Sequence, residues 1–280
     1  MKKILIIGSE GQVGSHLKTF LKKKKYQVLE FDIVRSKRED LRSQRNSILK
    51  NLIKKSDFIF FLAFDVGGSR YLKKYQNTFG FVSNNMKIMS NTFELINLYK
   101  KKFIFASSQM SNMTYSNYGI LKNIGERYTH LLNGIIVKFW NVYGVEKDLS
   151  KSHVITDFIL KALKKKKIEM LTNGQEERDF LYAEDCCNGL EIIMKKFNLL
   201  KKYNRPIDLT TGNYCKIINI AKLIKKIMDE KNIKVSIKPS QKLDLVQKNK
   251  RNLPSKFFFK FWKPQFTLEQ GIREILKYYL

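Results

Sequence analysis

The chain has 280 residues and a mass of 33.1 kDa, which suits one large domain or two that share a core. Hydrophobic residues make up 43% of it, and this content excludes a disordered chain, a collagen-like fibre and a disulfide-stapled mini-protein. The formal net charge of +29 would suit nucleic acid, an anionic membrane or a phosphate-bearing ligand. The lysine runs lie beside helical apolar patterns, as on ordinary solvated surfaces, so we do not expect a nucleic-acid partner.

The sequence predicts neither secretion, nor a membrane span, nor a metal site. Its cysteines, Cys186, Cys187 and Cys215, lack C-x-x-C spacing and form no even framework, which favours a reducing compartment. The apolar stretch 4–7 is too short for a signal peptide, and the longest apolar run, 58–64, is too short to cross a bilayer. We therefore expect a cytoplasmic protein.

Short β-rich runs alternate with longer helical patterns through the first half of the chain. Strands are predicted over residues 4–7, 27–31, 58–63, 103–106 and 134–139, and helices over 13–24, 46–55, 84–99 and 115–132. This alternation predicts an α/β fold with a Rossmann-type, doubly wound parallel sheet. In such a sheet, ligands bind beyond the carboxyl ends of the strands, where the strand order reverses.

The pattern loosens in the second half, where no proline-rich linker divides the chain. We predict helices and strands in alternation, followed by a C-terminal tail: helices over 153–165, 185–196 and 217–228, and strands over 178–182 and 207–209. The two halves are therefore expected to interleave as a larger and a smaller domain.

A glycine-rich turn follows the first predicted strand and opens the first helix. Gly8, Gly11 and Gly14 are spaced G-x-x-G-x-x-G, one residue different from the G-x-G-x-x-G dinucleotide fingerprint. Glycines here let the backbone turn tightly and approach a pyrophosphate, which would lie at the positive helix N-terminus together with Gln12 and Val13. A purely structural turn is the alternative.

The end of the second strand carries a carboxylate, Asp32, that can accept both ribose hydroxyls of an adenosine and would repel a 2′-phosphate. Glu10 adds negative charge nearby, and both residues favour NAD over NADP. Arg35, Lys37 and Arg38 argue the other way because they could collect a phosphate. We predict NAD as the cofactor; an ordinary turn cap is the alternative role for Asp32.

Tyr118 and Lys122 are four residues apart and therefore share one face of a predicted helix. A nearby ammonium is expected to lower the pKa of a tyrosine, which then takes or gives the proton of a carbinol while nicotinamide exchanges a hydride. Ser108, at the end of the preceding strand, could hydrogen-bond the same oxygen. We predict that these three residues are catalytic, although an exposed amphipathic helix would show the same spacing.

Taken in order, these motifs resemble the extended short-chain dehydrogenase/reductases, which are nucleotide-sugar epimerases, dehydratases and reductases. The resemblance spans nearly the whole chain and is carried by Gly8…Gly11…Gly14, Asp32, Asp40-Leu41, Leu62-Ala63, Asn85, Ser107-Ser108, Tyr118…Lys122, Asn141-Val142-Tyr143-Gly144, Arg178-Asp179-Phe180 and Trp262-Lys263-Pro264…Leu268-Glu269-Gln270-Gly271. It implies additional NAD contacts at Asp40, Leu41, Leu62, Ala63, Asn85, Tyr118 and Lys122, with Lys122 holding the nicotinamide ribose. It also implies an NAD-binding domain over 1–143 plus 178–213 and a nucleotide-sugar-binding domain over 144–177 plus 214–280.

Two segments resemble particular members of the family. Residues 61–69 look like the L-A-A-x-x-G-G segment of GDP-fucose synthases and GDP-mannose 3,5-epimerases, and residues 152–155 resemble the S-H-V-I of GDP-fucose synthase, whose histidine acts as an acid. Those relatives carry a cysteine base where this chain has Gln109, and the dehydratases carry Asp-Glu where it has Gln109 and Met110. Neither side chain titrates usefully, so 3,5-epimerisation and dehydration are not expected.

The resemblance also implies a substrate side of the site. Asn141 and Arg178 would contact the diphosphate, Gly67 and Gln109 would line the sugar pocket, and His153 would bind substrate or cap a helix. We expect a nucleotide-diphosphate sugar, by preference a GDP-sugar, and a homodimer formed through a four-helix interface.

The predicted function is NAD-dependent oxidation at C4 of a hexose or heptose, by a 4-epimerase or 4-dehydrogenase of surface polysaccharide biosynthesis. The alternatives are an NADP-dependent 4-keto-sugar reductase of the GDP-fucose synthase type and a non-catalytic, basic Rossmann sensor or binding protein.

Overall fold

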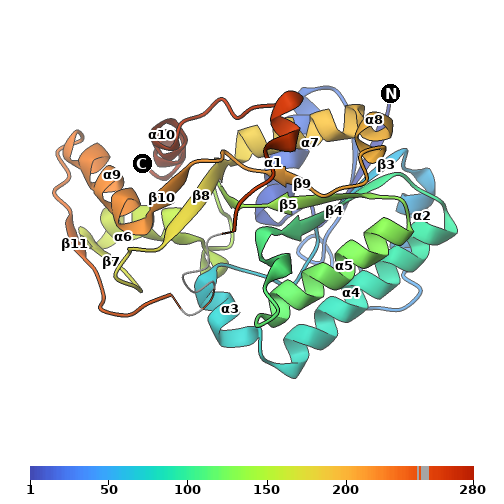
Figure 1. Cartoon of the computed structure of the whole chain (residues 1–280), viewed down its shortest axis with the longest axis horizontal. Helices are drawn as coiled ribbons and strands as arrows, with labels where there is room; N and C mark the ends of the chain where they lie inside the picture. Colours follow the sequence, from blue (N-terminus) through green and yellow to red (C-terminus); the bar gives the residue numbers. More distant parts are fainter. Residues whose placement is uncertain (245, 247–251) are drawn as a thin grey trace.

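The computed structural model describes residues 1–244, 246 and 252–280, and its larger part is built on a parallel sheet (Figure 1). The sheet has six strands in the order β2-β1-β3-β4-β5-β9. Their bounds are β1 Lys3–Ile7, β2 Gln27–Phe31, β3 Phe58–Phe61, β4 Phe103–Ser108, β5 Ile135–Phe139 and β9 Ile207–Leu209. Because β1 pairs with β2 on one side and β3 on the other, the strand order reverses there, as in a doubly wound fold. The predicted fold class is confirmed.

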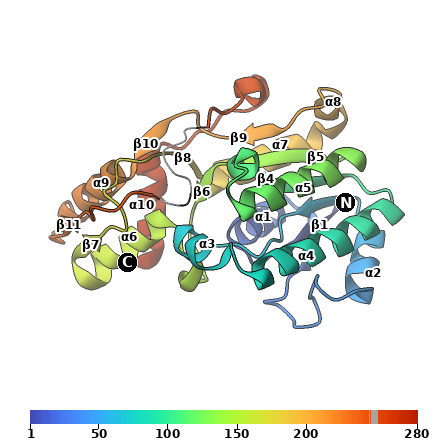
Figure 2. The ribbon, with the colours of Figure 1, turned by 60° about the horizontal axis from the view of Figure 1, so that its bottom comes forward.

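Helices cover both faces of this sheet (Figures 1 and 2). One face is covered by α1 (Gln12–Lys23), α7 (Ala183–Lys195) and the short α8 (Phe197–Lys201), and the other by α2 (Ser47–Lys55), α4 (Phe79–Leu98) and α5 (Asn117–Leu131). The strands are apolar on both sides because successive side chains point to opposite faces. Ile4 and Ile6 of β1 pack towards α1 and α7, whereas Leu5 and Ile7 pack towards α2 and α4.

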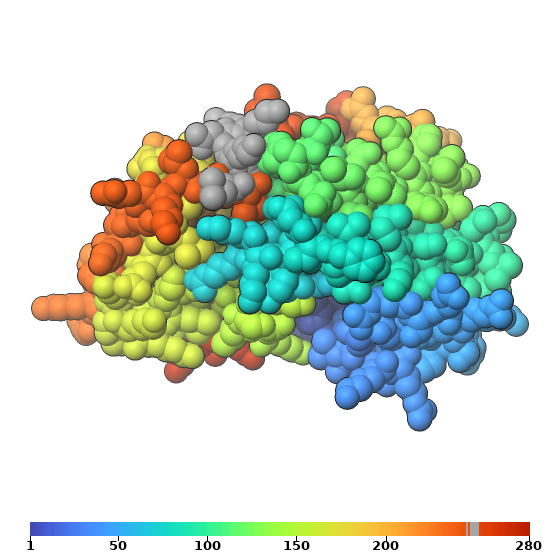
Figure 3. All heavy atoms as spheres, turned by 90° about the horizontal axis from the view of Figure 1, so that it is seen from below, coloured from blue at the N-terminus to red at the C-terminus, as the bar shows by residue number. Residues whose placement is uncertain are grey.

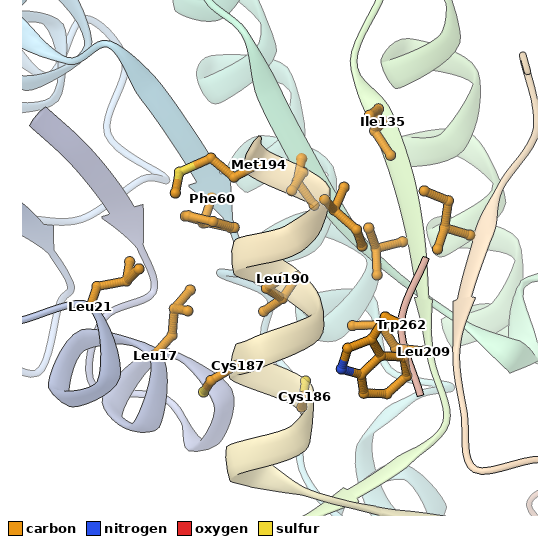
Figure 4. Packing of buried hydrophobic residues seen from close by; sticks show 14 of the residues in the cluster. Leu17, Leu21, Phe60, Ile135, Cys186, Cys187, Leu190, Met194, Leu209 and Trp262 are labelled. Carbon is orange, nitrogen blue, oxygen red and sulfur yellow. The ribbon is translucent and has the colours of Figure 1, made fainter. Parts of the chain in front are cut away.

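Two of the cysteines are part of this core. Cys186 and Cys187 lie on α7, Cys187 on the side of Leu17 from α1 and Cys186 on the side of Trp262 and Leu209 (Figure 4). Burial raises the pKa of both thiols, and the prediction that they are small core residues is confirmed.

The smaller part of the molecule lies at one end of the sheet and contains the C-terminus (Figures 1 and 2). It has a three-stranded sheet in the order β10-β8-β6, a two-stranded sheet β11-β7 and three helices around a separate apolar cluster. The bounds are β6 Asn141–Tyr143, β7 Lys167–Glu169, β8 Glu177–Tyr182, β10 Tyr214–Lys216, β11 Ser236–Lys238, α6 Val154–Lys165, α9 Ile217–Asp229 and α10 Leu268–Tyr279.

Several elements differ from the sequence expectations. The predicted C-terminal tail contains α10, which a reciprocal Thr267–Gln270 capping box begins. Helix α4 begins at Phe79 and not at 84, because the Thr78 side chain accepts a hydrogen bond from the Phe81 N–H. The seven-residue α3 (Ser69–Tyr75), the three-residue strands β6, β7, β10 and β11, and the 3-10 helices η1 Gln109–Asn112, η2 Leu149–Lys151 and η3 Lys256–Lys260 are too short for periodicity to reveal them. The three-residue strand β9 was predicted with its observed bounds.

Within the described residues, no helix is long and apolar enough to span a membrane. The same part of the chain contains no cluster of three or more His, Cys, Asp or Glu side chains that could hold a metal ion.

Gly14 is the tightest position of the turn between β1 and α1. A Cβ there would lie 1.9 Å from the Gly8 carbonyl oxygen, so Gly14→Ala must push the helix from the sheet. We expect this change to lower the free energy of unfolding by about 3 kcal/mol in urea titrations. Gly80→Ala is the matched control, since a Cβ there meets nothing within 4 Å. Equal stability of the two variants would contradict the close approach.

Candidate active site

A cavity of about 560 Å³ lies at the carboxyl ends of the parallel strands. In Figure 3, dark blue atoms of the N-terminal residues are visible in a hollow on this face. The cavity brings together most of the residues that the sequence analysis proposed: Gly8, Gly11, Gln12, Val13, Gly14, Asp32, Asp40, Leu41, Leu62, Ala63, Gly67, Ser108, Gln109, Tyr118, Lys122, Asn141 and His153.

The glycine turn has the shape that a dinucleotide pyrophosphate requires. Gly8 has φ +92°, and a Cβ on it would lie 2.7 Å from the Ala63 nitrogen, so only glycine fits. Gly11 is the N-cap of α1 and provides no side-chain cap, which leaves the amides of the first helical turn facing the cavity mouth. These residues fit the pyrophosphate of NAD.

Asp32 fastens this turn to the end of β2. Its carboxylate accepts hydrogen bonds from the backbone N–H groups of Glu10 and Val34, each at 2.9 Å. Glu10 is paired with Lys18 and with Lys147, the latter at 3.2 Å. Burial acts to raise the pKa of Glu10, but the hydrogen bonds from these two lysines hold it below its usual range. Two carboxylates therefore flank the place where the adenosine ribose of NAD would lie.

The basic residues that would favour a 2′-phosphate are occupied or lie elsewhere. Arg35 pairs with Glu30 and, at 3.5 Å, with Glu39. Arg42, which does line the cavity, is held by Asp40 at 2.8 Å. Lys37 and Arg38 are not among the described residues that line the cavity.

Helix α5 presents Tyr118 to the cavity. The helix begins where the Ser116 side chain accepts a hydrogen bond from the Gly119 N–H. Tyr118 is 9% exposed, and its phenol is hydrogen-bonded to Ser108 at the end of β4. Burial raises the pKa of Tyr118 to about 12, against the lowering effect of the Ser108 hydrogen bond. The structure thus places Ser108 beside the Tyr118 phenol, and the catalytic roles of both residues stay predictions.

Lys122 lies one helical turn further and is 3% exposed. Its Nζ donates to the Ala106 carbonyl at 2.6 Å and lies 3.8 Å from the centre of the Phe64 ring. Burial lowers the pKa of Lys122 to about 7, and the negative charge of Glu126 acts against this. We expected Lys122 to lower the pKa of Tyr118, and this expectation is wrong. Burial of the Tyr118 phenol raises its pKa, and the Lys122 ammonium contacts the Ala106 carbonyl and the Phe64 ring.

Sequence reasoning missed Glu126, a buried carboxylate one further turn along α5. Glu126 accepts a hydrogen bond from the Ser107 hydroxyl and lies 3.5 Å from Lys138 Nζ. This network ties α5 to β4 and β5 at the catalytic end of the sheet. The signal was present in the spacing, since Tyr118, Lys122 and Glu126 follow one another at intervals of four.

The smaller domain supplies the opposite wall of the cavity. Asn141 donates to the Asp179 carbonyl at 2.9 Å, and Gln109 accepts two hydrogen bonds from the Asn252 side chain, both at 2.6 Å. His153 is the N-cap of α6, and its Nδ1 lies 2.6 Å from the buried Glu146 carboxylate. Gln109 on η1 and Gly67 and Gly68 between β3 and α3 belong to the larger part and also line the cavity.

Two proposed site residues do not line the cavity within the described part of the chain. Asn85 is buried and holds the loop after β3, accepting from the Asp65 N–H at 2.8 Å and donating to its carbonyl at 3.2 Å. Arg178 forms an ion pair with Asp244. Their predicted contacts with NAD and diphosphate stay predictions.

Comparison with known proteins defines the class. Residues 4–205 match the NAD-dependent epimerase/dehydratase family, and the chain belongs to this family. It is 24% identical over 324 residues to the uncharacterized UDP-glucose epimerase YtcB of Bacillus subtilis, covering 99% of this chain and 97% of that protein.

Two solved structures show the same fold at 20% identity. The epimerase Mth375 of Methanothermobacter thermautotrophicus has a TM-score of 0.84, with 99% of this chain and 92% of that chain covered. MlghC, a GDP-mannoheptose C4 reductase from Campylobacter jejuni with NADP bound, has a TM-score of 0.79, with 99% and 98% covered. The resemblance to extended short-chain dehydrogenase/reductases, the NAD cofactor and the prediction of an enzyme of nucleotide-sugar metabolism are confirmed at the level of the family.

The burial of Lys122 predicts a pH-dependent stability effect. Its pKa of about 7 in the folded protein lies below the usual 10.5, so the buried ammonium destabilises the fold below pH 7, and this cost disappears as the pH rises towards 10.5. Lys122→Met should therefore raise the free energy of unfolding by about 2 kcal/mol near pH 6.

The gain should vanish at the alkaline end of a pH series of urea titrations. Lys87→Met, at an exposed lysine on α4, is the control and should show no such trend. A gain from Lys122→Met that is the same at every pH would show that Lys122 is not buried as a titrating group.

Proposed function

We propose that this protein is an NAD-dependent nucleotide-sugar oxidoreductase that acts at C4 of a hexose or heptose, as a 4-epimerase or 4-dehydrogenase. The observation that carries the proposal is the buried Tyr118 phenol, hydrogen-bonded to Ser108 on the cavity wall and one helical turn from Lys122. NAD, when bound, supplies the acceptor and donor of the hydride.

The side chains of this chain have distinct tasks in such a reaction. Ser108 holds the substrate oxygen beside the phenol, and Tyr118 exchanges a proton with that oxygen. With its pKa raised to about 12, Tyr118 is a neutral phenol in the protein and is ready to donate its proton in the reductive direction. In the oxidative direction it must first become phenolate, which the positive charge of Lys122 favours when the two groups approach.

The neutral phenol also favours a second candidate, an NADP-dependent 4-keto-sugar reductase of the GDP-fucose synthase type. A reductase needs only the proton-donating half of the cycle, whereas a 4-epimerase runs both halves. The C4 reductase activity named for the structural neighbour MlghC agrees with this alternative. Product analysis distinguishes the two, since an epimerase requires no net oxidant or reductant.

Two other reactions of the family lack their side chains here. Gln109, which follows Ser108, is tied to Asn252 and cannot remove a proton from carbon. Met110 is buried and has no titratable group. These residues favour hydride chemistry alone over dehydration or 3,5-epimerisation.

The substrate and the assembly are also part of the proposal. We infer a nucleotide-diphosphate sugar, with GDP favoured by the segments around Gly67 and His153, although the relative YtcB is named for UDP-glucose. The homodimer would form through α4 and α5, where Met86, Ile120 and Tyr128 are exposed. Cytoplasmic location, a role in surface polysaccharide biosynthesis and a division into an NAD-binding and a nucleotide-sugar-binding domain complete the proposal. The domain ranges given above are amended at β6 and β8, which share a sheet with β10 in the smaller part.

Tyr118→Phe tests the acid–base role. The change removes the phenolic hydroxyl and should lower kcat by about a thousandfold on the accepted nucleotide sugar, while NAD released on denaturation stays unchanged. Tyr278→Phe, at an exposed tyrosine of α10 in the smaller part, is the control and should keep full activity. Near-normal turnover by Tyr118→Phe would refute the assignment.

Asp32→Ala tests the preference for NAD. Removing this carboxylate takes away the ribose acceptor and the repulsion of a 2′-phosphate, so the ratio of the Kd for NADP to that for NAD should fall at least about tenfold. Asp57→Asn is the control, because Asp57 lies at the opposite end of β3 beside Lys3. An unchanged ratio would show that Asp32 only caps the turn.

A further inference from the structure

Phe64 is an aromatic residue in the wall of the cavity. It directly follows Leu62 and Ala63, in the segment between β3 and α3. Its half-buried ring is 3.8 Å from Lys122 Nζ and meets the Tyr118 ring edge-on, with the centroids 5.7 Å apart and the planes at 79°. One aromatic ring thus contacts both members of the proposed catalytic pair.

The other groups around Lys122 leave its charge only partly compensated. On its own helix it faces Tyr118, which is a neutral phenol, and Glu126, which already serves Ser107 and Lys138. On β4 it meets the Ala106 carbonyl oxygen and, more distantly than Phe64, the Phe105 ring at 5.1 Å from the centroid. Lys138 on β5 adds a second positive charge to the network.

A desolvated ammonium over an aromatic face is stabilised more strongly than the same pair in water. Lys122 is only 3% exposed, so its ammonium interacts with the Phe64 ring out of contact with water, where the attraction is stronger. An alanine in its place could not provide the interaction.

We propose that Phe64 is a positioning residue: its ring face keeps Lys122 charged and in place beside Tyr118, and thereby sets the pH range in which the pair works. The link to catalysis rests on the proposed function, whereas the interaction between the two side chains does not. The two parts therefore require separate measurements.

A double-mutant cycle with Phe64→Leu and Lys122→Met measures the interaction itself. Leucine keeps an apolar side chain but has no aromatic face, and unfolding is followed in urea at about pH 6 and about pH 9.5. Near pH 6 the coupling should amount to a factor of about five to thirty in the unfolding equilibrium constant. It should disappear near pH 9.5, where Lys122 is neutral because burial lowers its pKa to about 7. No coupling near pH 6, or equal coupling at both values, would overturn the proposal.

The pH dependence of kcat tests the link to catalysis. The alkaline limb reports loss of the Lys122 charge and should move down by about one pH unit in Phe64→Leu. Phe64→Tyr keeps the ring face, so its alkaline limb should remain in place. If the enzyme does not act on the sugars tested, the double-mutant cycle still shows whether Phe64 and Lys122 interact. If the cycle shows coupling but the limb of Phe64→Leu does not move, Phe64 has no part in setting the working pH.

Discussion

The burial of one ammonium, that of Lys122, sets the charge at the cavity end of this fold. Lys122 is placed by α5 among groups from two neighbouring strands, the Ala106 carbonyl on β4 and the Phe64 ring after β3. Burying a charge costs free energy unless the surrounding groups compensate it, and here a carbonyl, the rings of Phe64 and Phe105 and a shared carboxylate do so only in part. Whether Lys122 carries a positive charge beside Tyr118 depends on that compensation.

The same burial explains the state of the tyrosine. Taking the phenol out of water stabilises its neutral form, so Tyr118 is a proton donor by default and becomes a base only when a positive charge comes close. The glycine turn and Asp32 form the end of the cavity proposed for the cofactor. Close backbone contacts and hydrogen bonds hold them there, without help from Tyr118 or Lys122. Cofactor binding and proton transfer are thus supported by different parts of the sheet edge, and a substitution in one should leave the other largely intact.

The sequence was sufficient for the sheet, its order of elements and most of the cavity lining, because buried strands and glycine turns have strong local patterns. The sequence did not predict which groups surround Lys122. Phe64 follows β3 and Ala106 lies on β4, and only the folded sheet brings them next to α5. The Tyr–Lys spacing alone led to the wrong direction for the pKa of Tyr118, because spacing says nothing about desolvation. Arg178 likewise carried no sign of its partner Asp244, which lies 66 residues further along the chain.

The central claim, that Tyr118 and Lys122 serve hydride transfer at C4, is tested most directly by the fate of the C4 hydrogen. GDP- and UDP-sugars deuterated at C4 would be incubated with the protein, and deuterium would be traced by mass spectrometry in the nicotinamide ring and in the sugar. The account predicts that deuterium passes from C4 to the nicotinamide ring and that oxidation is slowed by the label. Deuterium that is lost to water, or oxidation that does not involve C4, would contradict it.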